Sequence, residues 1–108
     1  MPSSMTTWRQ ANPERAKIQS RNATVALRER QRQLVAEAKT GPCVDCGRDD
    51  LPVEAMDLDH VPGRGEKLFT LSTVRKRPIG QVIAEIAKCD RVCPTCHRLR
   101  TIARKVAT

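Results

Sequence analysis

The chain has 108 residues and a formal net charge of +8, and Trp8 and Phe69 are the only members of the Phe, Trp and Tyr group. A domain this small and this poor in aromatics buries little apolar area, so a metal ion or a covalent cross-link is expected to stabilise it. No apolar stretch resembles a signal peptide or is long enough to cross a bilayer. This argues against secreted and membrane proteins and predicts a cytoplasmic location.

The charge is unevenly distributed along the chain. Residues 1–40 carry 8 Lys and Arg against 3 Asp and Glu, residues 41–60 carry 1 against 6, and residues 61–108 carry 11 against 3. An acidic segment between two basic flanks suits a cation site set in a surface that binds a polyanion such as nucleic acid. The alternative, that the basic side chains only keep the protein solvated, stays open on charge alone.

A long helix is predicted over residues 14–39, because this stretch lacks Pro and Gly and is rich in Ala, Arg, Gln and Glu. Asn12 is the predicted N-cap, and Pro13 takes the first helical position. The helix is expected to end at Gly41-Pro42. Residues 1–12 are predicted to be a frayed start.

The apolar stripe of this helix is thin, so we expect its C-terminal turns to be buried and the rest to project. The stripe consists of Ile18, Val25, Leu27, Leu34 and Ala38. We therefore divide the chain into a basic helical arm, residues 1–39, and a compact domain, residues 40–108. The basic side chains of the helix would either lie on phosphates or keep the helix in solution. They are Arg15, Lys17, Arg21, Arg28, Arg30 and Arg32.

Four of the five cysteines form two Cys-x-x-Cys pairs, Cys43 with Cys46 and Cys93 with Cys96, with 46 residues between the pairs. A pair on a tight turn directs two thiolates at one ion, and four thiolates complete the tetrahedron that zinc prefers. We therefore predict a structural zinc site. Disulfides are the disfavoured alternative, because cytoplasmic thiols are kept reduced. Cys89 is left over and is predicted to be a buried thiol.

Two short strands are predicted in the compact domain. Residues 53–60 alternate imperfectly between apolar and polar side chains, and residues 89–92 lead into the second cysteine pair. Strict alternation places Asp59 and His60 on opposite faces of the first strand. The strand must therefore bend or end at His60 if both side chains serve one site, and the Val-Pro-Gly that follows favours this.

The connection after the first strand is a Gly-rich basic loop over residues 62–70, in which Arg64 and Lys67 are candidate phosphate contacts. A short helix is predicted over residues 71–76. Pro78 opens a further helix whose apolar residues recur at helical spacing and predict a packed face. They are Ile79, Val82, Ile83, Ile86 and Ala87.

The last helix is predicted to start at Pro94. Its expected buried stripe consists of Leu99, Ile102, Ala103 and Val106. A second face carries His97, Arg100 and Arg104 at positions i, i+3 and i+7. A histidine followed by two arginines on one face suits a metal site beside a phosphate chain.

Both histidines of the chain stand next to other candidate site residues. His60 directly follows Asp59, and His97 directly follows the zinc thiol Cys96. We predict that Asp59 and His97 hold a divalent ion with open positions for water and a phosphate oxygen. His60 would act as the general base that deprotonates the attacking water.

Together, residues 58–63 (Leu-Asp-His-Val-Pro-Gly), 65–67 (Gly-Glu-Lys), 85–90 (Glu-Ile-Ala-Lys-Cys-Asp) and 93–101 (Cys-Pro-Thr-Cys-His-Arg-Leu-Arg-Thr) resemble the small, zinc-binding HNH endonucleases that are common in bacteriophage genomes. The resemblance covers about residues 28–102. It implies an α+β fold: a small ββα-metal (His-Me finger) core stapled by a four-cysteine zinc site, here with a long N-terminal helix.

The resemblance also implies a function, namely metal-dependent hydrolysis or nicking of DNA. By motif position Asp59 and His97 would be ligands of Mg²⁺, Mn²⁺ or Ni²⁺, and His60 would be the general base. The two cysteine pairs match the structural zinc of the family. The candidate contacts to DNA are Arg64, Lys67, Arg98, Arg100 and Arg104.

One position departs from the family pattern. The family is named for a central Asn, and no Asn follows Asn22 in this chain. Lys88 and Asp90 stand nearest to that position, so the residue that orients the base or the substrate is unassigned.

The resemblance extends to partners as well. Members of this phage group often lie beside terminase genes and assist DNA packaging, which implies double-stranded DNA and the terminase large subunit as partners in the cytoplasm of a bacterial host. Two alternatives are a zinc-stabilised DNA-binding module that does not cleave, and an interaction subunit of a packaging motor that docks through the N-terminal helix.

Overall fold

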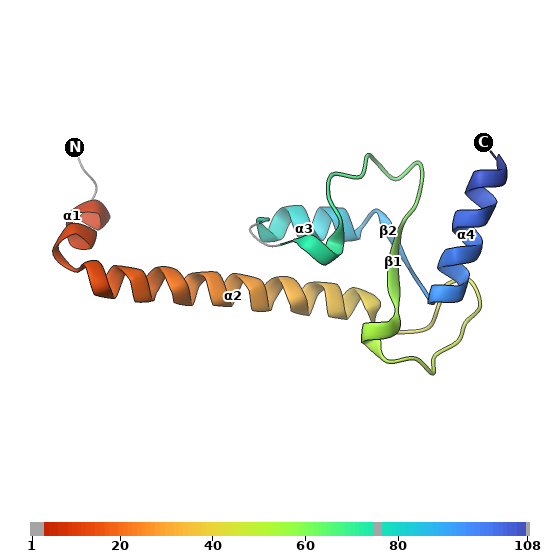
Figure 1. The fold of residues 1–108 in the computed structure, drawn as a ribbon, viewed down its shortest axis with the longest axis horizontal. Helices are drawn as coiled ribbons and strands as arrows, with labels where there is room; N and C mark the ends of the chain where they lie inside the picture. Colours follow the sequence, from red (N-terminus) through yellow and green to blue (C-terminus); the bar gives the residue numbers. More distant parts are fainter. Residues whose placement is uncertain (1–3, 75–76, 108) are drawn as a thin grey trace.

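The structure is a computed structural model that describes residues 4–74 and 77–107. Its helices are α1 (Ser4–Ala11), α2 (Pro13–Lys39), α3 (Ile79–Ile86) and α4 (Pro94–Ala107), and its strands are β1 (Asp57–His60) and β2 (Cys89–Val92). Four helices and a two-stranded sheet within the described residues confirm the predicted α+β class (Figure 1). In the same part of the chain, no helix combines the length and the apolar character needed to cross a bilayer.

The molecule is elongated, with principal extents of 60 × 31 × 16 Å. Helix α2 causes this shape, because its N-terminal part extends well beyond α3, the sheet and α4 (Figure 1). Pro13 is its first residue, as predicted, but the Asn12 side chain makes no cap. Asn12 Nδ2 instead donates to the carbonyl oxygen of Trp8 at 3.0 Å.

Helix α1 shows that the predicted frayed start is wrong for Ser4–Ala11. Arg9 Nη2 donates to Ser20 Oγ of α2 at 2.7 Å, and Ala16 of α2 is buried. The hydrogen bond from Arg9 to Ser20 joins two helices, so local composition alone could not reveal it.

The C-terminal turns of α2 hold the arm on the compact domain, as expected. Leu34 and Val35 pack against a buried cluster of Phe69, Leu71 and Val82. Gln31 is also buried, and its Nε2 donates to the carbonyl oxygen of Arg77 at 2.7 Å. Towards the N-terminus, Ile18 and Val25 are exposed. The arm is therefore anchored at one end and projects at the other.

The sheet joins β1 and β2 in antiparallel order, with Asp59 opposite Asp90 and His60 opposite Cys89. A 3-10 turn at Val53–Ala55 replaces the first part of the strand predicted over residues 53–60. The second strand has its predicted bounds.

A further 3-10 turn, Leu71–Thr73, stands at the start of the helix predicted over residues 71–76. Arg75 and Lys76 lie outside the described residues. In α3 the predicted apolar face is only partly correct: Val82 is fully buried, whereas Ile83 is half exposed.

The predicted buried stripe of α4 is wrong. Leu99, Ile102 and Val106 are 59%, 49% and 83% exposed, and Ala103 is exposed as well. The face of α4 that carries Arg100 and Arg104 lies against the acidic residues of the sheet instead. Hydrophobic periodicity predicted that α4 packs through its apolar face. The strands present carboxylates to α4 instead, so the face that carries the arginines packs against the sheet.

Candidate metal centre and active site

The four predicted zinc ligands come together. The sulfur atoms of Cys43, Cys46, Cys93 and Cys96 all lie within 4.8 Å of one another, and Cys46 Sγ is 3.9 Å from Cys93 Sγ. Four thiolates at about 2.3 Å from one zinc ion have their sulfurs about 3.8 Å apart. The cluster is therefore able to hold a metal ion such as zinc, with the ligands that the sequence predicted.

The first cysteine pair is formed by a tight backbone turn. Gly47 N donates to the carbonyl oxygen of Cys43 at 2.9 Å, and Cys43 N donates to that of Arg48 at 3.0 Å. Gly47 has φ of 76°, a left-handed conformation in which a Cβ is disfavoured. Val44 N donates to the carbonyl oxygen of Arg91 at 3.0 Å, so the turn is fixed to β2.

The second pair opens α4. Cys96 N lies 3.4 Å from Cys93 Sγ, and His97 N donates to the carbonyl oxygen of Cys93 at 2.9 Å. Burial acts to raise the pKa of Cys43, but backbone N–H groups of the two turns outweigh it and lower that pKa to about 6. Burial raises the pKa of Cys89, which lies outside the cluster, to about 11.

Asp59 is the most enclosed carboxylate of β1 and is only 2% exposed. Arg104 of α4 binds it through two hydrogen bonds, from Nη1 to Oδ1 at 2.8 Å and from Nη2 to Oδ2 at 2.7 Å. Arg100 Nη1 donates to Oδ2 at 3.0 Å. Burial acts to raise the pKa of Asp59, but these hydrogen bonds outweigh burial and hold the pKa below its usual value.

His97 lies between two carboxylates that β1 presents on one face. Its Nδ1 is 3.0 Å from Asp57 Oδ2, and its Nε2 is 3.5 Å from Asp59 Oδ1. If Nδ1 carries the proton and donates it to Asp57, the lone pair of Nε2 faces the space beside Asp59. A histidine that binds a metal commonly donates its other N–H to a carboxylate in this way.

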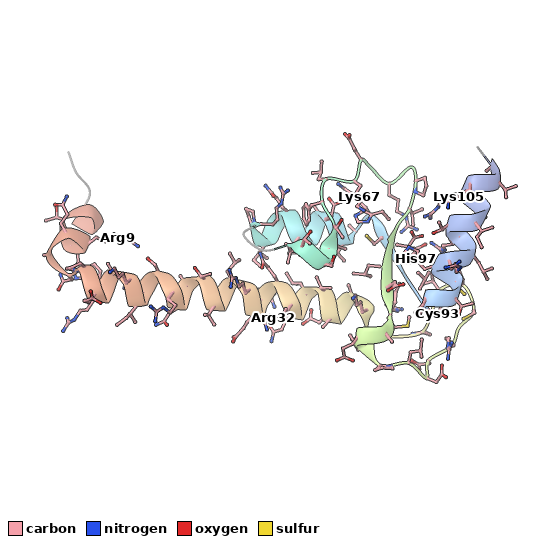
Figure 2. The ribbon with its side chains drawn as sticks, viewed as in Figure 1. Arg9, Arg32, Lys67, Cys93, His97 and Lys105 are labelled. Atoms are coloured by element: carbon pink, nitrogen blue, oxygen red, sulfur yellow. The ribbon has the colours of Figure 1, made fainter. Side chains whose placement is uncertain are left out.

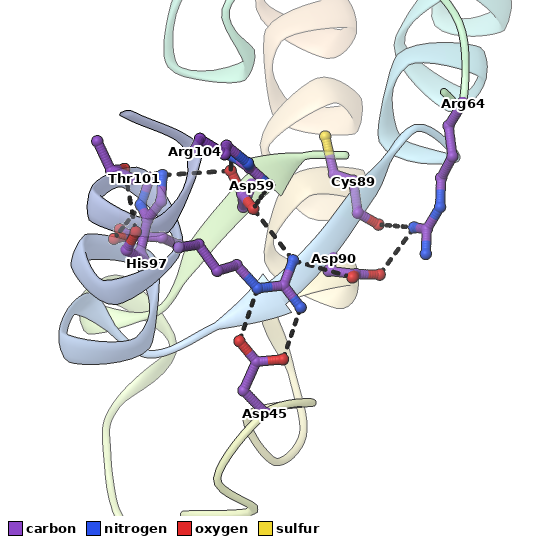
Figure 3. Close-up of polar contacts among 10 residues, drawn as sticks. Asp45, Asp59, Arg64, Cys89, Asp90, His97, Thr101 and Arg104 are labelled. Atoms are coloured by element: carbon purple, nitrogen blue, oxygen red, sulfur yellow. Dashed lines mark hydrogen bonds and ion pairs between the residues drawn. The ribbon is translucent and has the colours of Figure 1, made fainter. Parts of the chain in front are cut away.

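Arg100 connects three carboxylates from different segments, those of Asp45, Asp59 and Asp90, which are labelled in Figure 3. It forms two hydrogen bonds of 2.6 Å to Asp45 and single hydrogen bonds of 3.0 Å to Asp59 and Asp90. Hydrogen bonds from Arg100 lower the pKa of Asp45, and Arg64 and Arg100 overcome the effect of burial to lower that of Asp90. Arg100 thereby links the turn of the first cysteine pair, both strands and α4.

His60 faces away from this network, towards α3. Its Nε2 is 2.8 Å from Glu85 Oε2, and Glu85 is only 1% exposed. Lys88 Nζ and the backbone N–H of Leu68 also donate to the Glu85 carboxylate, at 2.8 and 3.1 Å. Burial acts to raise the pKa of Glu85, but these donors outweigh it and lower the pKa to about 2. A charged carboxylate thus fixes the histidine ring.

One pocket of about 520 Å³ nevertheless includes all three predicted catalytic residues. Asp59, His60 and His97 line it together with Lys39 at the end of α2. β1 pairs with β2 along one edge, and side chains from both faces of β1 reach the pocket. The strand ends at His60. The sequence analysis required the strand to bend or end there if Asp59 and His60 were to serve one site.

The predicted phosphate contacts fall into two groups. Arg100 and Arg104 bind carboxylates as described above, and Arg64 Nη1 donates to Asp90 Oδ1 at 2.7 Å. Lys67 and Arg98 are exposed, and Lys67 lines the pocket. Three of the five side chains are therefore engaged in holding the site together.

Several residues of the site were missed at the sequence level. Glu85 stands on the face of α3 that also carries the buried Val82, and a carboxylate on an apolar helix face is a signal that could have revealed it. Asp57 is two residues before Asp59 and shares its face, so strand periodicity could have revealed it as well. Asp45 offers no comparable local signal, because its partner Arg100 lies 55 residues away in the sequence and reaches it only through the packing of α4.

A comparison of this chain with protein-family models, with curated proteins and with solved structures finds no match. Its function must therefore be inferred from the residues of the site.

Proposed function

We propose that this chain is a metal-dependent DNA endonuclease or nickase of the HNH type. Asp59 and His97 would hold a catalytic divalent ion, and His60 would be the general base. The observation that carries the proposal is the 3.5 Å separation of Asp59 Oδ1 and His97 Nε2 in a pocket that His60 also lines. The four-cysteine cluster supports it, because it fixes Cys96 and with it the adjacent His97.

The residues present fit a divalent ion. Two ligand atoms that are each about 2.1 Å from a shared ion lie about 3.0–3.5 Å apart, which agrees with the observed separation. A carboxylate offers about four lone-pair positions, and those of Asp59 accept three hydrogen bonds, of which one is on Oδ1. Oδ1 therefore retains capacity for a cation.

The local charge also favours a cation. The connected network contains four carboxylates (Asp45, Asp57, Asp59, Asp90) and three guanidinium groups (Arg64, Arg100, Arg104). The balance is one negative charge before His97 is considered. When bound, a divalent ion would neutralise charge on the phosphate that reacts and on the leaving oxygen.

His60 supplies the base in this proposal, and Glu85 positions it. If Nε2 of His60 carries the proton and donates it to Glu85, Nδ1 is the nitrogen that accepts a proton from water. Glu85 would then take the orienting role that a central Asn has in the family that the sequence resembles. Lys88, which stood near that position in the sequence, donates to Glu85 instead of to the histidine.

Nicking of supercoiled plasmid tests the proposal. The zinc-loaded protein is incubated with Mg²⁺, Mn²⁺ or Ni²⁺, and wild type is compared with His60→Ala. We expect metal-dependent nicking that falls at least about 100-fold in the variant, the usual contribution of a general base. Ser72→Ala is the matched control, because Ser72 also lines the pocket but is given no role in the proposed chemistry. Equal nicking by wild type and His60→Ala would refute the assignment of the base.

A zinc-stabilised DNA-binding module that does not cleave is the second candidate. The observation that favours it is the set of three hydrogen bonds from Arg100 and Arg104 to Asp59, since these compete with metal coordination. This candidate predicts salt-dependent DNA binding without nicking in any of the three metals. A role beside a phage terminase large subunit stays a prediction from the family resemblance.

A further inference from the structure

Five basic residues of α2 share one face of the helix. They are Lys17, Arg21, Arg28, Arg32 and Lys39. At 3.6 residues per turn, their directions fall within about 60° of the helix circumference. Arg15 and Arg30 point to the other side, at about 160° and 220° from Lys17. We call the five residues the α2 stripe.

The cations of the α2 stripe are largely uncompensated. Within the described residues, Arg21, Arg28, Arg32 and Lys39 form no ion pair with a carboxylate within 4.0 Å, and the three arginines are exposed. Lys17 is 3.8 Å from Glu14, but both side chains are highly exposed. An exposed pair of this kind contributes little. The stripe is thus available to an external polyanion.

The α2 stripe leads to the candidate active site. Lys39 lines the pocket that contains His60 and Asp59, and Arg32 and Lys39 line an adjoining pocket of about 370 Å³. Glu54 is the acidic residue of that second pocket. From Lys17 to Lys39 the stripe extends about 33 Å, at 1.5 Å per residue. Figure 2 shows Arg32 on the stretch of α2 between the projecting end of the arm and the site.

The chemistry of α2 selects among polyanions. Its sequence contains no Phe, Trp or Tyr, so it offers neither the aromatic platforms on which single-stranded bases stack nor the aromatic anchors of membrane-surface helices. What it offers is a straight row of cations about as long as one turn of duplex DNA. A duplex presents phosphates at regular intervals and needs no contact with bases for this type of binding.

We propose that the α2 stripe binds the sugar-phosphate backbone of double-stranded DNA and guides the duplex along the arm to the pocket at Lys39. This inference rests on the proposed function only for what occurs in the pocket, and binding along the arm does not require cleavage.

A pair of charge-matched double variants tests this inference. Arg21→Gln/Arg28→Gln removes two positive charges from the stripe, and Arg15→Gln/Arg30→Gln removes two from the other side of the same helix. Gln preserves helix propensity, and circular dichroism confirms that both proteins are helical. Binding of a 30-base-pair duplex to the zinc-loaded, full-length chain is measured over a series of salt concentrations by fluorescence anisotropy.

We expect the stripe variant to reduce the slope of log affinity against log salt by about 2, close to 0.9 per lost phosphate contact, and the control to leave the slope near the wild-type value. An equal reduction in both variants would show that only total charge matters and would overturn the inference. Stronger binding of single-stranded DNA, of duplex RNA or of vesicles containing anionic lipid than of the DNA duplex would also overturn it.

The two proposals can fail separately. All binding is measured in the His60→Ala background, so cleavage does not alter the ligand. If wild type nicks DNA with none of the metals but only the stripe variant shows the reduced salt slope, the nuclease proposal fails and the inference stands. If nicking depends on His60 but both double variants bind like wild type, the nuclease proposal stands and the inference fails.

Discussion

Four arginines of the compact domain have surroundings opposite to those of the arginines in the arm. In the domain Arg48, Arg64, Arg100 and Arg104 each bind at least one carboxylate within 3.0 Å. In the arm, Arg9 donates to the hydroxyl group of Ser20. Among the described residues, no arginine of the arm forms an ion pair with a carboxylate. Residues 41–108 carry 12 Lys and Arg against 9 Asp and Glu, and residues 1–40 carry 8 against 3. These four arginines of the domain are thus bound to carboxylates, whereas those of the arm other than Arg9 are surface charges without a carboxylate partner among the described residues.

This difference changes what the net charge of the chain means. A count of basic residues assigns similar importance to Arg104 and Arg28 as partners of DNA. The structure shows Arg104 bound to a buried aspartate and Arg28 exposed on α2. If the chain binds DNA as proposed, we expect the exposed cations of the arm to attract it more strongly than arginines such as Arg104 that already bind carboxylates.

Removal of zinc is expected to have the largest effect and to act on the compact domain. Cys96→Ser deletes one of the four thiol ligands, and binding of a structural zinc ion contributes on the order of 10 kcal/mol to folding. We expect the variant to lose bound zinc, and the domain to lose its amide-exchange protection at β1 and β2. Metal content and hydrogen exchange measure both effects.

Cys89→Ser is the matched control for this prediction, because Cys89 lies outside the cluster. It should keep one zinc ion per chain and the protection of both strands. A Cys96→Ser protein that retained stoichiometric zinc and a protected sheet would contradict the four-thiolate site.

Acid is expected to have the second-largest effect, and again on the domain. The pKa of Glu85 is lowered from 4.5 to about 2 in the folded protein, so its contribution to stability is complete above pH 4.5 and is lost as the pH falls towards 2. Asp45, Asp59 and Asp90 also have lowered pKa values and act in the same direction. Urea unfolding over this pH range should show a steep loss of stability.

Glu85→Gln identifies the contribution of the single carboxylate. Gln cannot ionise, so the variant should show a shallower dependence of unfolding free energy on pH between 4.5 and 2. Glu29→Gln, on the exposed surface of α2, should retain the wild-type dependence. Identical slopes for wild type and Glu85→Gln would argue against the buried contacts of this residue.

The features that the sequence predicted are those with local causes. Two Cys-x-x-Cys pairs have the spacing of metal-binding turns, and the composition of residues 14–39 favours a helix without help from other segments. The second strand was also located correctly.

The features that the sequence did not predict depend on distant partners. Leu99 and Val106 mark an apolar face of α4, but the opposite face is the one held against the sheet, because Asp59 and Asp90 bind Arg100 there. In the same way, the contact of Glu85 with His60 joins residues 25 positions apart. Pairing of charges between elements outweighed hydrophobic periodicity within one element.

Truncation of one arginine in each region gives the most direct test of the comparison and has the smallest expected effect. Arg104→Ala leaves the buried carboxylate of Asp59 with a single hydrogen bond, from Arg100, and with His97 Nε2 at 3.5 Å. Breaking a buried pair destabilises by about 3–5 kcal/mol, and we expect about 2 kcal/mol here because Arg100 stays in place and Arg104 is partly exposed. Arg28→Ala should change the unfolding free energy by less than about 0.5 kcal/mol, as is usual for an exposed side chain.

DNA binding should reverse the order of these two variants. Arg28→Ala removes a cation of the α2 stripe and should reduce the salt slope by about 1, whereas Arg104→Ala removes a guanidinium whose hydrogen bonds are directed at Asp59 and should reduce it less. Urea unfolding gives the free energy of unfolding of each variant, and DNA binding over a series of salt concentrations gives the salt slope of each variant. If both variants shifted stability and salt slope alike, the separation between structural arginines in the domain and free arginines on the arm would not hold.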